Sequence, residues 1–150
     1  LEDSRMTVID RPWGQEIIFA ETPTYMGKIL KRCAGTKGDL QSHLKHESHY
    51  LSAGRLIVRT LIDGALTEAS MEPGDAWHVP AGVVHQEEAL TDCVEFEVAE
   101  PTLNDRHVVE SAAGLPSTPH RERLAMAYTL AHAYQQRADE LYAAVVLTTR

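Results

Sequence analysis

The sequence has little cysteine and no long hydrophobic run, and each absence excludes a class of protein. Two cysteines among 150 residues, Cys33 and Cys93, form no disulfide framework, and we expect both to be buried, reduced thiols. No apolar run approaches the roughly 20 residues that span a bilayer. The sequence also shows no positively charged start followed by an apolar block, so we expect no signal peptide and a reducing, cytoplasmic location.

Positive charge is scarce as well. The 14 lysines and arginines are outnumbered by 22 aspartates and glutamates, which gives a formal net charge of −8. This excess of negative charge argues against nucleic acid or an anionic membrane as the main partner. A length of 150 residues with 43% hydrophobic content is ordinary for one soluble domain with a buried core.

Helical periodicity is absent from residues 7–99, which instead contain many short β-prone runs separated by turn residues such as Asp63-Gly64. The runs lie at residues 8–9, 16–20, 27–34, 48–53, 55–62, 66–70, 76–79, 85–89 and 93–99. We interpret residues 36–46 as a polar loop. Short strands at this spacing predict an all-β sandwich or barrel and argue against alternating strands and helices.

The composition changes after Pro101, and residues 100–119 have the prolines and glycine of a linker. Thr118-Pro119 is then typical of a helix start, and apolar residues recur at helical spacing from 120 to about 146. We expect this helix to pack on the barrel or at a dimer interface. The two predicted units are therefore a barrel over residues 1–110 and a linker with a C-terminal helix over residues 111–150.

Two stretches framed by glycines place candidate metal ligands on β-hairpins. The first stretch contains Gly35, Gln41, His43, Glu47 and Gly54, and the second contains Gly74, Pro80, Gly82 and His85. The glycines permit the turn geometry that brings strand ends together. Two imidazoles, a carboxylate and an amide oxygen suit one divalent transition metal (Fe, Mn, Ni, Co or Zn) without selecting among these ions. Four protein ligands would leave one or two positions for water or substrate.

Other histidines lie near these ligands. His49 shares a strand face with Glu47, and it is a candidate fifth ligand, a general base beside the metal or a core histidine. His46 offers an alternative ligand set with His43 and Glu47. His78 lies one strand away, and we expect it to stay outside the site.

Two further glutamates are candidate acid–base groups. Glu87 shares a strand face with His85, and Glu97 lies in an otherwise apolar strand. Each could support the metal ligands or move a proton, and each could instead be a solvated side chain.

The two glycine-framed stretches resemble the two sequence motifs of the cupins. Residues 35–54 match every spacing of the first motif, with Gln41 in place of its first histidine. Residues 74–89 match the second motif, with Ala89 where asparagine is usual. The resemblance covers residues 8–100, and it implies a jelly-roll β-barrel, commonly dimeric, that holds one divalent metal.

A narrower resemblance is to the cupin branch of type II mannose-6-phosphate isomerases. It rests on Arg11-Pro12-Trp13-Gly14, Gly27-Lys28, the Gln-x-His variant and Val98-Ala99-Glu100-Pro101. This resemblance implies metal-assisted proton transfer between neighbouring carbons of a sugar phosphate. Lys28 would then face the cavity and bind an anionic group, or it would be a surface lysine. Trp77 and Tyr50 are further substrate-binding candidates.

The sequence therefore predicts a metal-dependent cupin enzyme that acts on a small, polar, sugar-like or hydroxy-carbonyl substrate and forms a homodimer. Isomerase-type proton transfer by His49, Glu87 or Glu97 is the specific expectation. Two alternatives stay open. One is an Fe(II) cupin dioxygenase, which needs open metal positions and access for oxygen, and the other is a non-catalytic cupin that binds a small molecule.

Overall fold

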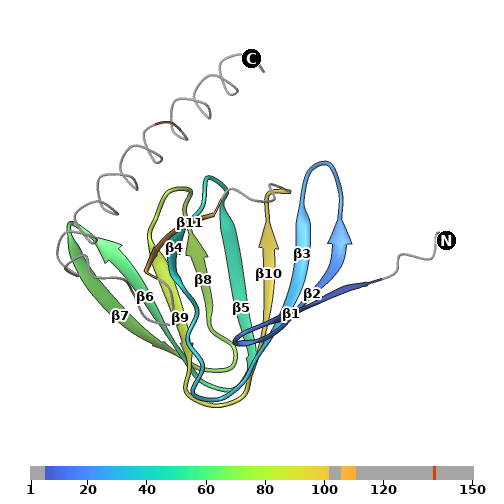
Figure 1. Cartoon of the computed structure of the whole chain (residues 1–150), viewed down its shortest axis with the longest axis horizontal. Coiled ribbons are helices and arrows are strands. Elements are labelled where there is room, and N and C mark those ends of the chain that lie inside the picture. The colour runs from blue at the N-terminus through green and yellow to red at the C-terminus, as the bar shows by residue number, and fades with distance from the viewer. Residues whose placement is uncertain (1–5, 102–105, 111–136, 138–150) are drawn as a thin grey trace.

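The structure is a computed structural model that describes residues 6–101, 106–110 and 137. Its strands form two antiparallel sheets that face each other (Figure 1). The first sheet has the order β1 (Thr7–Arg11), β2 (Gly14–Glu21), β3 (Met26–Arg32), β10 (Cys93–Ala99), β5 (Glu47–Ala53) and β8 (Ala76–Val79). The second sheet has the order β11 (His107–Glu110), β4 (Leu40–Ser42), β9 (His85–Ala89), β6 (Leu56–Ile62) and β7 (Ala65–Met71).

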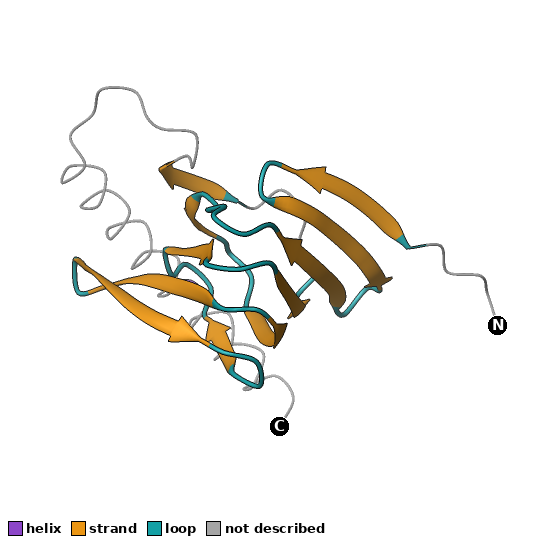
Figure 2. Ribbon diagram, turned by 90° about the horizontal axis from the view of Figure 1, so that it is seen from below, coloured by secondary structure: helices purple, strands orange, loops and turns teal. Residues whose placement is uncertain are grey.

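The described chain is almost entirely strand and connecting loop (Figure 2), which confirms the predicted all-β class. Nearly every predicted run coincides with a strand to within a few residues. The predicted C-terminal helix lies outside the described residues, apart from Arg137, which is helical. In the part of the chain that the structure describes, no helix is long and apolar enough to cross a membrane.

Two short strands were not predicted. Strand β4 lies inside the expected loop over residues 36–46, and strand β11 lies inside the expected linker over residues 100–119. They have three and four residues and pair with each other, and β4 also pairs with β9. Runs this short carry too little alternation to be recognised from the sequence, so residues 40–42 of the expected loop and residues 107–110 of the expected linker are corrected to strands.

The hydrophobic core fills only part of the space between the sheets. Its main cluster contains Leu51, Leu56, Val58, Ala89 and Cys93. A smaller cluster contains Leu40, Leu61 and Val84. Because side chains alternate along each strand, the same inward faces that supply this core also carry buried polar residues farther along. The core therefore supports a polar region inside the same barrel.

Two of the motif glycines have identifiable steric roles. Gly54 adopts a φ of 88°, and a Cβ there would lie 2.2 Å from the carbonyl oxygen of Asp92, so a side chain cannot be accommodated. Gly82 adopts a φ of 82°, and its backbone N–H donates to the carbonyl of His43 at 2.6 Å. This bond ties the turn of the second motif to the ligand segment of the first.

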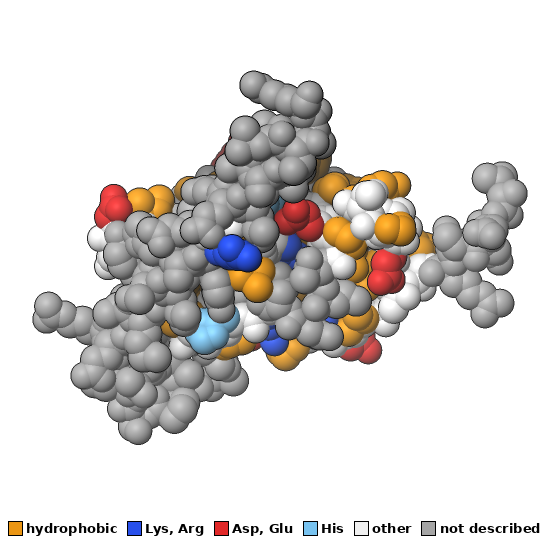
Figure 3. All heavy atoms as spheres, turned by 90° about the horizontal axis from the view of Figure 1, so that it is seen from above, with side chains coloured by type: hydrophobic (Ala, Val, Ile, Leu, Met, Phe, Trp, Pro, Cys, Tyr) orange, Lys and Arg blue, Asp and Glu red, His pale blue; other side chains and the backbone are white. Residues whose placement is uncertain are grey.

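The structure corrects one expectation about the cysteines. Cys93 is buried as predicted, but Cys33 is exposed because it lies past the end of β3, in the turn that leads to Gly35. Hydrophobic side chains also reach the surface (Figure 3). Tyr50 and Phe96, which pair between β5 and β10, are both exposed on the outer face of the first sheet. Exposed apolar residues of this kind are ordinary in folded proteins.

Candidate metal centre

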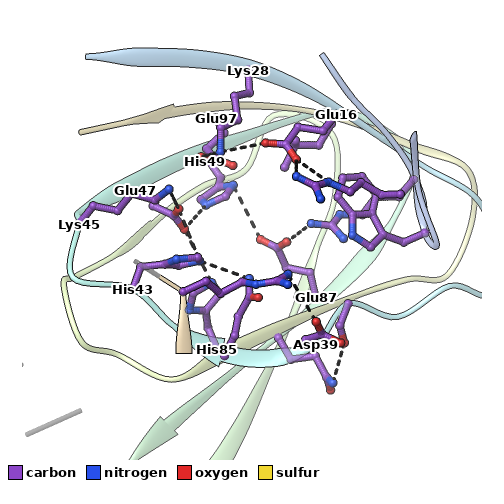
Figure 4. A pocket seen from close by; sticks show the side chains of 18 residues that line it. Glu16, Lys28, Asp39, His43, Lys45, Glu47, His49, His85, Glu87 and Glu97 are labelled. Atoms are coloured by element: carbon purple, nitrogen blue, oxygen red, sulfur yellow. Dashed lines mark hydrogen bonds and ion pairs between the residues drawn. The ribbon is translucent and has the colours of Figure 1, made fainter. Parts of the chain in front are cut away.

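A cavity of about 230 Å³ lies within the barrel and is lined mostly by polar and charged side chains (Figure 4). Among the described residues that line it, only Trp13 and Leu30 are apolar. A volume below the usual 300–1,000 Å³ of drug-sized pockets fits a small molecule. Because the lining is mostly polar and charged, this molecule should itself be polar.

Three predicted ligands converge on this cavity, and we call them the metal cluster: His43, Glu47 and His85. His43 follows β4, whereas Glu47 and His85 are the first residues of β5 and β9. One ligand atom from each lies within 4.8 Å of the others. Nε2 of His43 lies 3.7 Å from Glu47 Oε1, and Nε2 of His85 lies 3.7 Å from Glu47 Oε2. Two imidazoles and one carboxylate at this spacing can hold a divalent cation.

The hydrogen bonding of His85 prepares it for such a role. Its Nδ1 lies 3.0 Å from the carbonyl oxygen of Val83, which can only accept a hydrogen bond. The proton of a neutral ring therefore lies on Nδ1, and the lone pair of Nε2 is directed at the other members of the metal cluster.

Gln41 lies beside the metal cluster because it pairs with His85 between β4 and β9. Its amide nitrogen is 3.3 Å from His43 Nε2, and its Oε1 is buried with no hydrogen-bond partner among the described residues. A half-turn of the amide exchanges these two atoms and would direct the oxygen at the cluster. An amide oxygen in this position suits a cation better than it suits a second imidazole.

The charges buried in the barrel are unbalanced in a way that favours a cation. Among the described buried residues there are five glutamates but only three lysine and arginine side chains, those of Lys28, Arg32 and Lys45. Lys28 and Arg32 are each shared between two carboxylates, and Glu47 has Lys45 at 3.5 Å, so a divalent cation beside Glu47 would offset the excess of negative charge. Burial opposes ionisation of Glu47, but the imidazoles of His49, His43 and His85 hold its pKa well below the usual range. The residues present therefore fit a divalent metal.

A second group lies next to the first, and we call it the His49 cluster: His49, Glu87 and Glu95. Nδ1 of His49 is 3.7 Å from Glu87 Oε1 and 3.9 Å from Glu95 Oε2. Arg32 already occupies the far side of this cluster, since it donates from Nε to Glu95 Oε1 at 2.6 Å and from Nη2 to Glu87 Oε2. Its guanidinium also stacks on Trp13, with Cζ 4.3 Å from the ring centroid.

The His49 cluster has strongly shifted pKa values. Burial opposes the charged form of His49, but the carboxylates of Glu87, Glu47 and Glu95 prevail and raise its pKa to about 9. Burial, together with the charge of Glu87, raises the pKa of Glu95 to about 7. Burial opposes ionisation of Glu87, but Arg32 and His49 hold its pKa below the usual value. Such shifts are typical of functional sites and of structural ion networks alike.

The predicted cavity residues Lys28 and Glu97 are paired with each other. Lys28 Nζ lies 2.9 Å from Glu97 Oε1 and 3.2 Å from Glu16 Oε1, and Glu16 is also bound by Arg11. Burial opposes the charge of Lys28, but Glu97 and Glu16 raise its pKa. Lys28 thus faces the cavity as predicted, but two carboxylates already neutralise it, so it is not an uncommitted anion-binding group.

Four other sequence candidates lie away from the cavity lining. Tyr50 is exposed on the outer face of β5, and this position does not support a substrate-binding role. Trp77 stacks on His49 with ring centroids 5.0 Å apart and planes at 4°, so it supports that ring from behind. His46 and His78 stack on each other outside the site, and the alternative ligand set with His46 does not form.

Several cavity residues were not anticipated from the sequence. They are Trp13, Glu16, Arg32, Lys45 and Arg106. Glu95, which was not anticipated either, does not line the cavity but binds Arg32. Alternation places Arg32 on the face of Lys28, and Glu95 on the face of Glu97, so strand parity was an available signal. The signal could not show which strands would be neighbours, nor that Arg32 would also meet Glu87 of the opposite sheet.

Comparisons with known proteins show which solved structures share this fold. No family model matches the sequence, and no curated protein matches it. Solved structures do match: capsular polysaccharide assembling protein CapF from Staphylococcus aureus has a TM-score of 0.65 at 16% identity, over 73% of this chain and 33% of CapF. KdgF from Halomonas sp. has a TM-score of 0.58 at 24% identity, over 70% of this chain and 94% of KdgF. Oxalate decarboxylase from Bacillus subtilis has a TM-score of 0.60 at 17% identity, over 71% of this chain and 30% of the decarboxylase.

These neighbours are all cupin-fold proteins, and the chain has the cupin fold. The match spans only about a third of the length of CapF but nearly all of KdgF. Identities below 25% establish the fold alone. The narrower resemblance to type II mannose-6-phosphate isomerases stays a prediction.

Proposed function

We propose that this protein is a metal-dependent enzyme that moves a proton between neighbouring carbons of a small hydroxy-carbonyl substrate, such as a sugar. The observation that carries the proposal is the convergence of His43, Glu47 and His85 on a small polar cavity, with a further histidine beside them. A divalent cation bound there would act as a Lewis acid that polarises the carbonyl of the substrate.

The ligand set leaves room for a substrate. The metal cluster supplies three ligand atoms, and Gln41 could supply a fourth. All of them line the cavity, so remaining coordination positions would face it. The solved CapF complex at 19% identity contains an inhibitor, 3-isopropenyl-tropolone, whose adjacent hydroxyl and carbonyl oxygens are the kind of pair that chelates a metal. The Bacillus subtilis oxalate decarboxylase that shares the fold has Mn(II) centres.

His49 is the best-placed group to transfer a proton, and its pKa of about 9 makes it a donor at neutral pH and an acceptor once its ring is neutral. Its Nε2 lies 3.7 Å from Glu47 Oε2, yet His49 does not belong to the group of ligand atoms that lie within 4.8 Å of one another. This favours a base beside the metal over a fifth ligand. Glu97 also lines the cavity, but its ion pair with Lys28 engages it elsewhere. An imidazole at this distance from the ligands is suitably positioned for general base catalysis.

Deuterium exchange tests this proposal directly. The Mn²⁺- or Zn²⁺-loaded protein is incubated in D₂O with a panel of aldoses, ketoses and their phosphates, and the carbon-bound protons are followed by NMR. We expect exchange or aldose–ketose conversion with at least one substrate, and its loss in Glu47→Gln and in His49→Gln. Binding of tropolone and of sugars by a metal-loaded protein that exchanges no proton would contradict catalysis and would favour a binding role.

A second candidate function is that of an Fe(II) dioxygenase. Two histidines and one carboxylate are the donor set of non-haem iron oxygenases, and the metal cluster has this composition. Oxygen consumption by the Fe²⁺-loaded protein, on the same panel and without proton exchange, would favour this candidate. The homodimer and the cytoplasmic location stay predictions of the sequence.

A further inference from the structure

The outer side of the first sheet carries a row of apolar side chains that crosses all six strands. Register pairs link its members from β1 to β8: Val8, Ile17, Ile29, Phe96, Tyr50 and Ala76. Paired residues present their side chains on the same side of a sheet, so these side chains are neighbours. Phe96 and Tyr50 lie near the middle of the row and are 39% and 47% exposed.

A second apolar row lies beside the first, and a bulge completes it. Val98 pairs with Gly27, which in turn pairs with Ala20. The register of β2 shifts between Ile18 and Ala20, and this bulge places the ring of Phe19 over Gly27, where a Cβ would lie 2.6 Å from Cζ of Phe19. We call the two rows together the outer apolar face.

A single exposed apolar residue is ordinary, but a connected face of this size is not. Six strands about 4.8 Å apart, with about 20 Å of length each, give the outer side of the sheet an area of roughly 500 Å², with the apolar rows at its centre. The largest apolar patch on a typical monomer is about 300–600 Å² and often has a function. Two such faces in contact would bury roughly 1,000 Å², which is what a specific interface needs.

The charge of this face suits a partner of the same kind. Among the described strand residues on the outer side of the first sheet, Asp10 and Lys31 are the only aspartate, glutamate, lysine or arginine side chains. Both belong to the row at one margin, where Asp10 accepts a hydrogen bond from Gln15. These two charges cancel, although the whole chain carries a formal charge of −8. Two copies of this acidic chain therefore repel each other over much of their surfaces but not across this face.

We propose that the outer apolar face binds a second copy of this chain, face to face, about a two-fold axis. The two sheets would stack about 10 Å apart, as sheets do inside proteins, and each copy would present the same surface to the other. Phe19, Tyr50 and Phe96 supply the aromatic side chains in which interface cores are enriched. The inference is independent of the proposed function, because His49 and Glu97 alternate with Tyr50 and Phe96 and face the cavity on the inner side.

The rest of this chain is a less suitable occupant of the outer apolar face. The last described strand, β11, lies in the second sheet, on the opposite side of the barrel. A segment that follows Glu110 would have to pass around the barrel to reach the face. A second copy reaches it directly.

Sedimentation velocity of the full chain at micromolar concentrations tests this proposal. We expect the mass of two chains for the parent protein and of one chain for Phe96→Lys and for Val98→Lys. The dissociation constant of the dimer should rise at least about 100-fold, because each substitution enters a symmetric interface twice. Both side chains are exposed, so each variant should fold, and circular dichroism verifies this.

Ile62→Lys is the matched control. Ile62 is 53% exposed, as Val98 is, but it lies on β6 of the second sheet. This variant should stay dimeric. A monomeric parent protein, which is the result if its own C-terminal residues or another protein cover the face, would overturn the proposal. A dimer that survives both Phe96→Lys and Val98→Lys, or that Ile62→Lys disrupts as strongly, would overturn it as well.

Mixing complementary variants tests the two-fold symmetry. Phe96 lies on β10, the fourth of the six strands, so its two copies approach each other across an axis at the middle of the face. Phe96→Lys and Phe96→Glu should each be monomeric alone and should associate when mixed, because a lysine then meets a glutamate. A mixture that stays monomeric while the parent protein is dimeric would contradict the face-to-face arrangement.

Discussion

The metal cluster and the His49 cluster contain the same kinds of side chain at almost the same spacing, yet they differ in what surrounds them. Each combines imidazole and carboxylate groups about 3.7 Å apart, and by composition alone each could hold a cation. The His49 cluster has Arg32 bound to its two carboxylates, whereas the metal cluster has Lys45 only at 3.5 Å from Glu47. The charge of the neighbours, more than the ligands themselves, separates a cation site from a positioning network.

The two clusters also differ in their place along the strands. Glu47 and His85 begin their strands and His43 precedes β5, so these residues lie at an end of the barrel. The members of the His49 cluster lie within β5, β9 and β10, and Glu95 is completely buried. Side chains at strand ends can exchange a ligand with solvent, while those within the strands are held by packing on every side.

Replacing Arg32 should cause the largest loss of stability, and it would remove the cation that distinguishes the His49 cluster from the metal cluster. Arg32→Met leaves Glu87 and Glu95 buried without their cation, and we expect unfolding in urea to show a loss of about 3–5 kcal/mol. Arg32→Lys keeps the charge but cannot bind both carboxylates in the same way, so it should lose less. A loss below about 1 kcal/mol for Arg32→Met would mean that the pairing is not what stabilises this cluster.

Lys28 tests whether the remaining carboxylates depend on protein cations in the same way. Lys28→Met should cost about 3 kcal/mol at neutral pH, because Glu16 and Glu97 lose their buried partner. The pKa of Lys28 is raised, so its contribution is present below 10.5 and is lost as pH rises past the folded value. Burial raises the pKa of Glu16, but Lys28 and Arg11 lower it overall, so that contribution is present above 4.5 and is lost as pH falls.

The cost of Lys28→Met should therefore be greatest between about pH 4.5 and 10.5 and should shrink outside this window. Urea unfolding of both proteins across this range measures the difference. A cost that does not depend on pH would show that lost packing, and not lost charge pairing, explains the effect.

Glu47 is the carboxylate on which the metal cluster depends. Glu47→Gln should weaken binding of Zn²⁺ or Mn²⁺ by more than about 100-fold, since substitution of groups that merely support ligands costs 10- to 100-fold. Isothermal titration calorimetry measures the affinity. The double substitution His46→Ala with His78→Ala removes two surface histidines and should leave the affinity unchanged. Equal losses of metal affinity in Glu47→Gln and in the double variant would contradict this placement, because the surface histidines would then contribute as much as Glu47.

Gln41 should have the smallest effect and sharpens the definition of the metal cluster. Gln41→Ala removes a neutral amide oxygen, and we expect an affinity loss of about tenfold, which the same calorimetry measures. Gln41→His restores the first histidine of the cupin motif and should bind metal at least as tightly as the parent. Weaker binding by Gln41→His than by Gln41→Ala would mean that the side chain at this position does not face the cation.

Much of the fold was predictable because alternation and turn residues repeat through residues 7–99. The short strand β4 escaped recognition, and with it the pairing that brings Gln41 beside His85. The ligands were predictable from motif spacing, which is a local property of the chain. Tyr50 was misplaced although the alternation was available, since a neighbour of His49 in one strand must face the other way.

The His49 cluster depends on contacts that the spacing of residues along the sequence does not predict. Arg32 lies 55 residues from Glu87 and 63 from Glu95 in the sequence. It meets Glu95 because β3 and β10 are paired in one sheet, and it meets Glu87 because β9 belongs to the facing sheet. Such a contact depends on how the sheets pack. No pattern within one strand encodes it, so the network became visible only in the structure.

Metal content after loading and exhaustive dialysis tests the central claim most directly. The account predicts one zinc or manganese ion per parent chain, and none in the chain with His43, Glu47 and His85 all replaced by alanine. A parent chain that retains no ion, or a substituted chain that retains as much as the parent, would contradict the assignment.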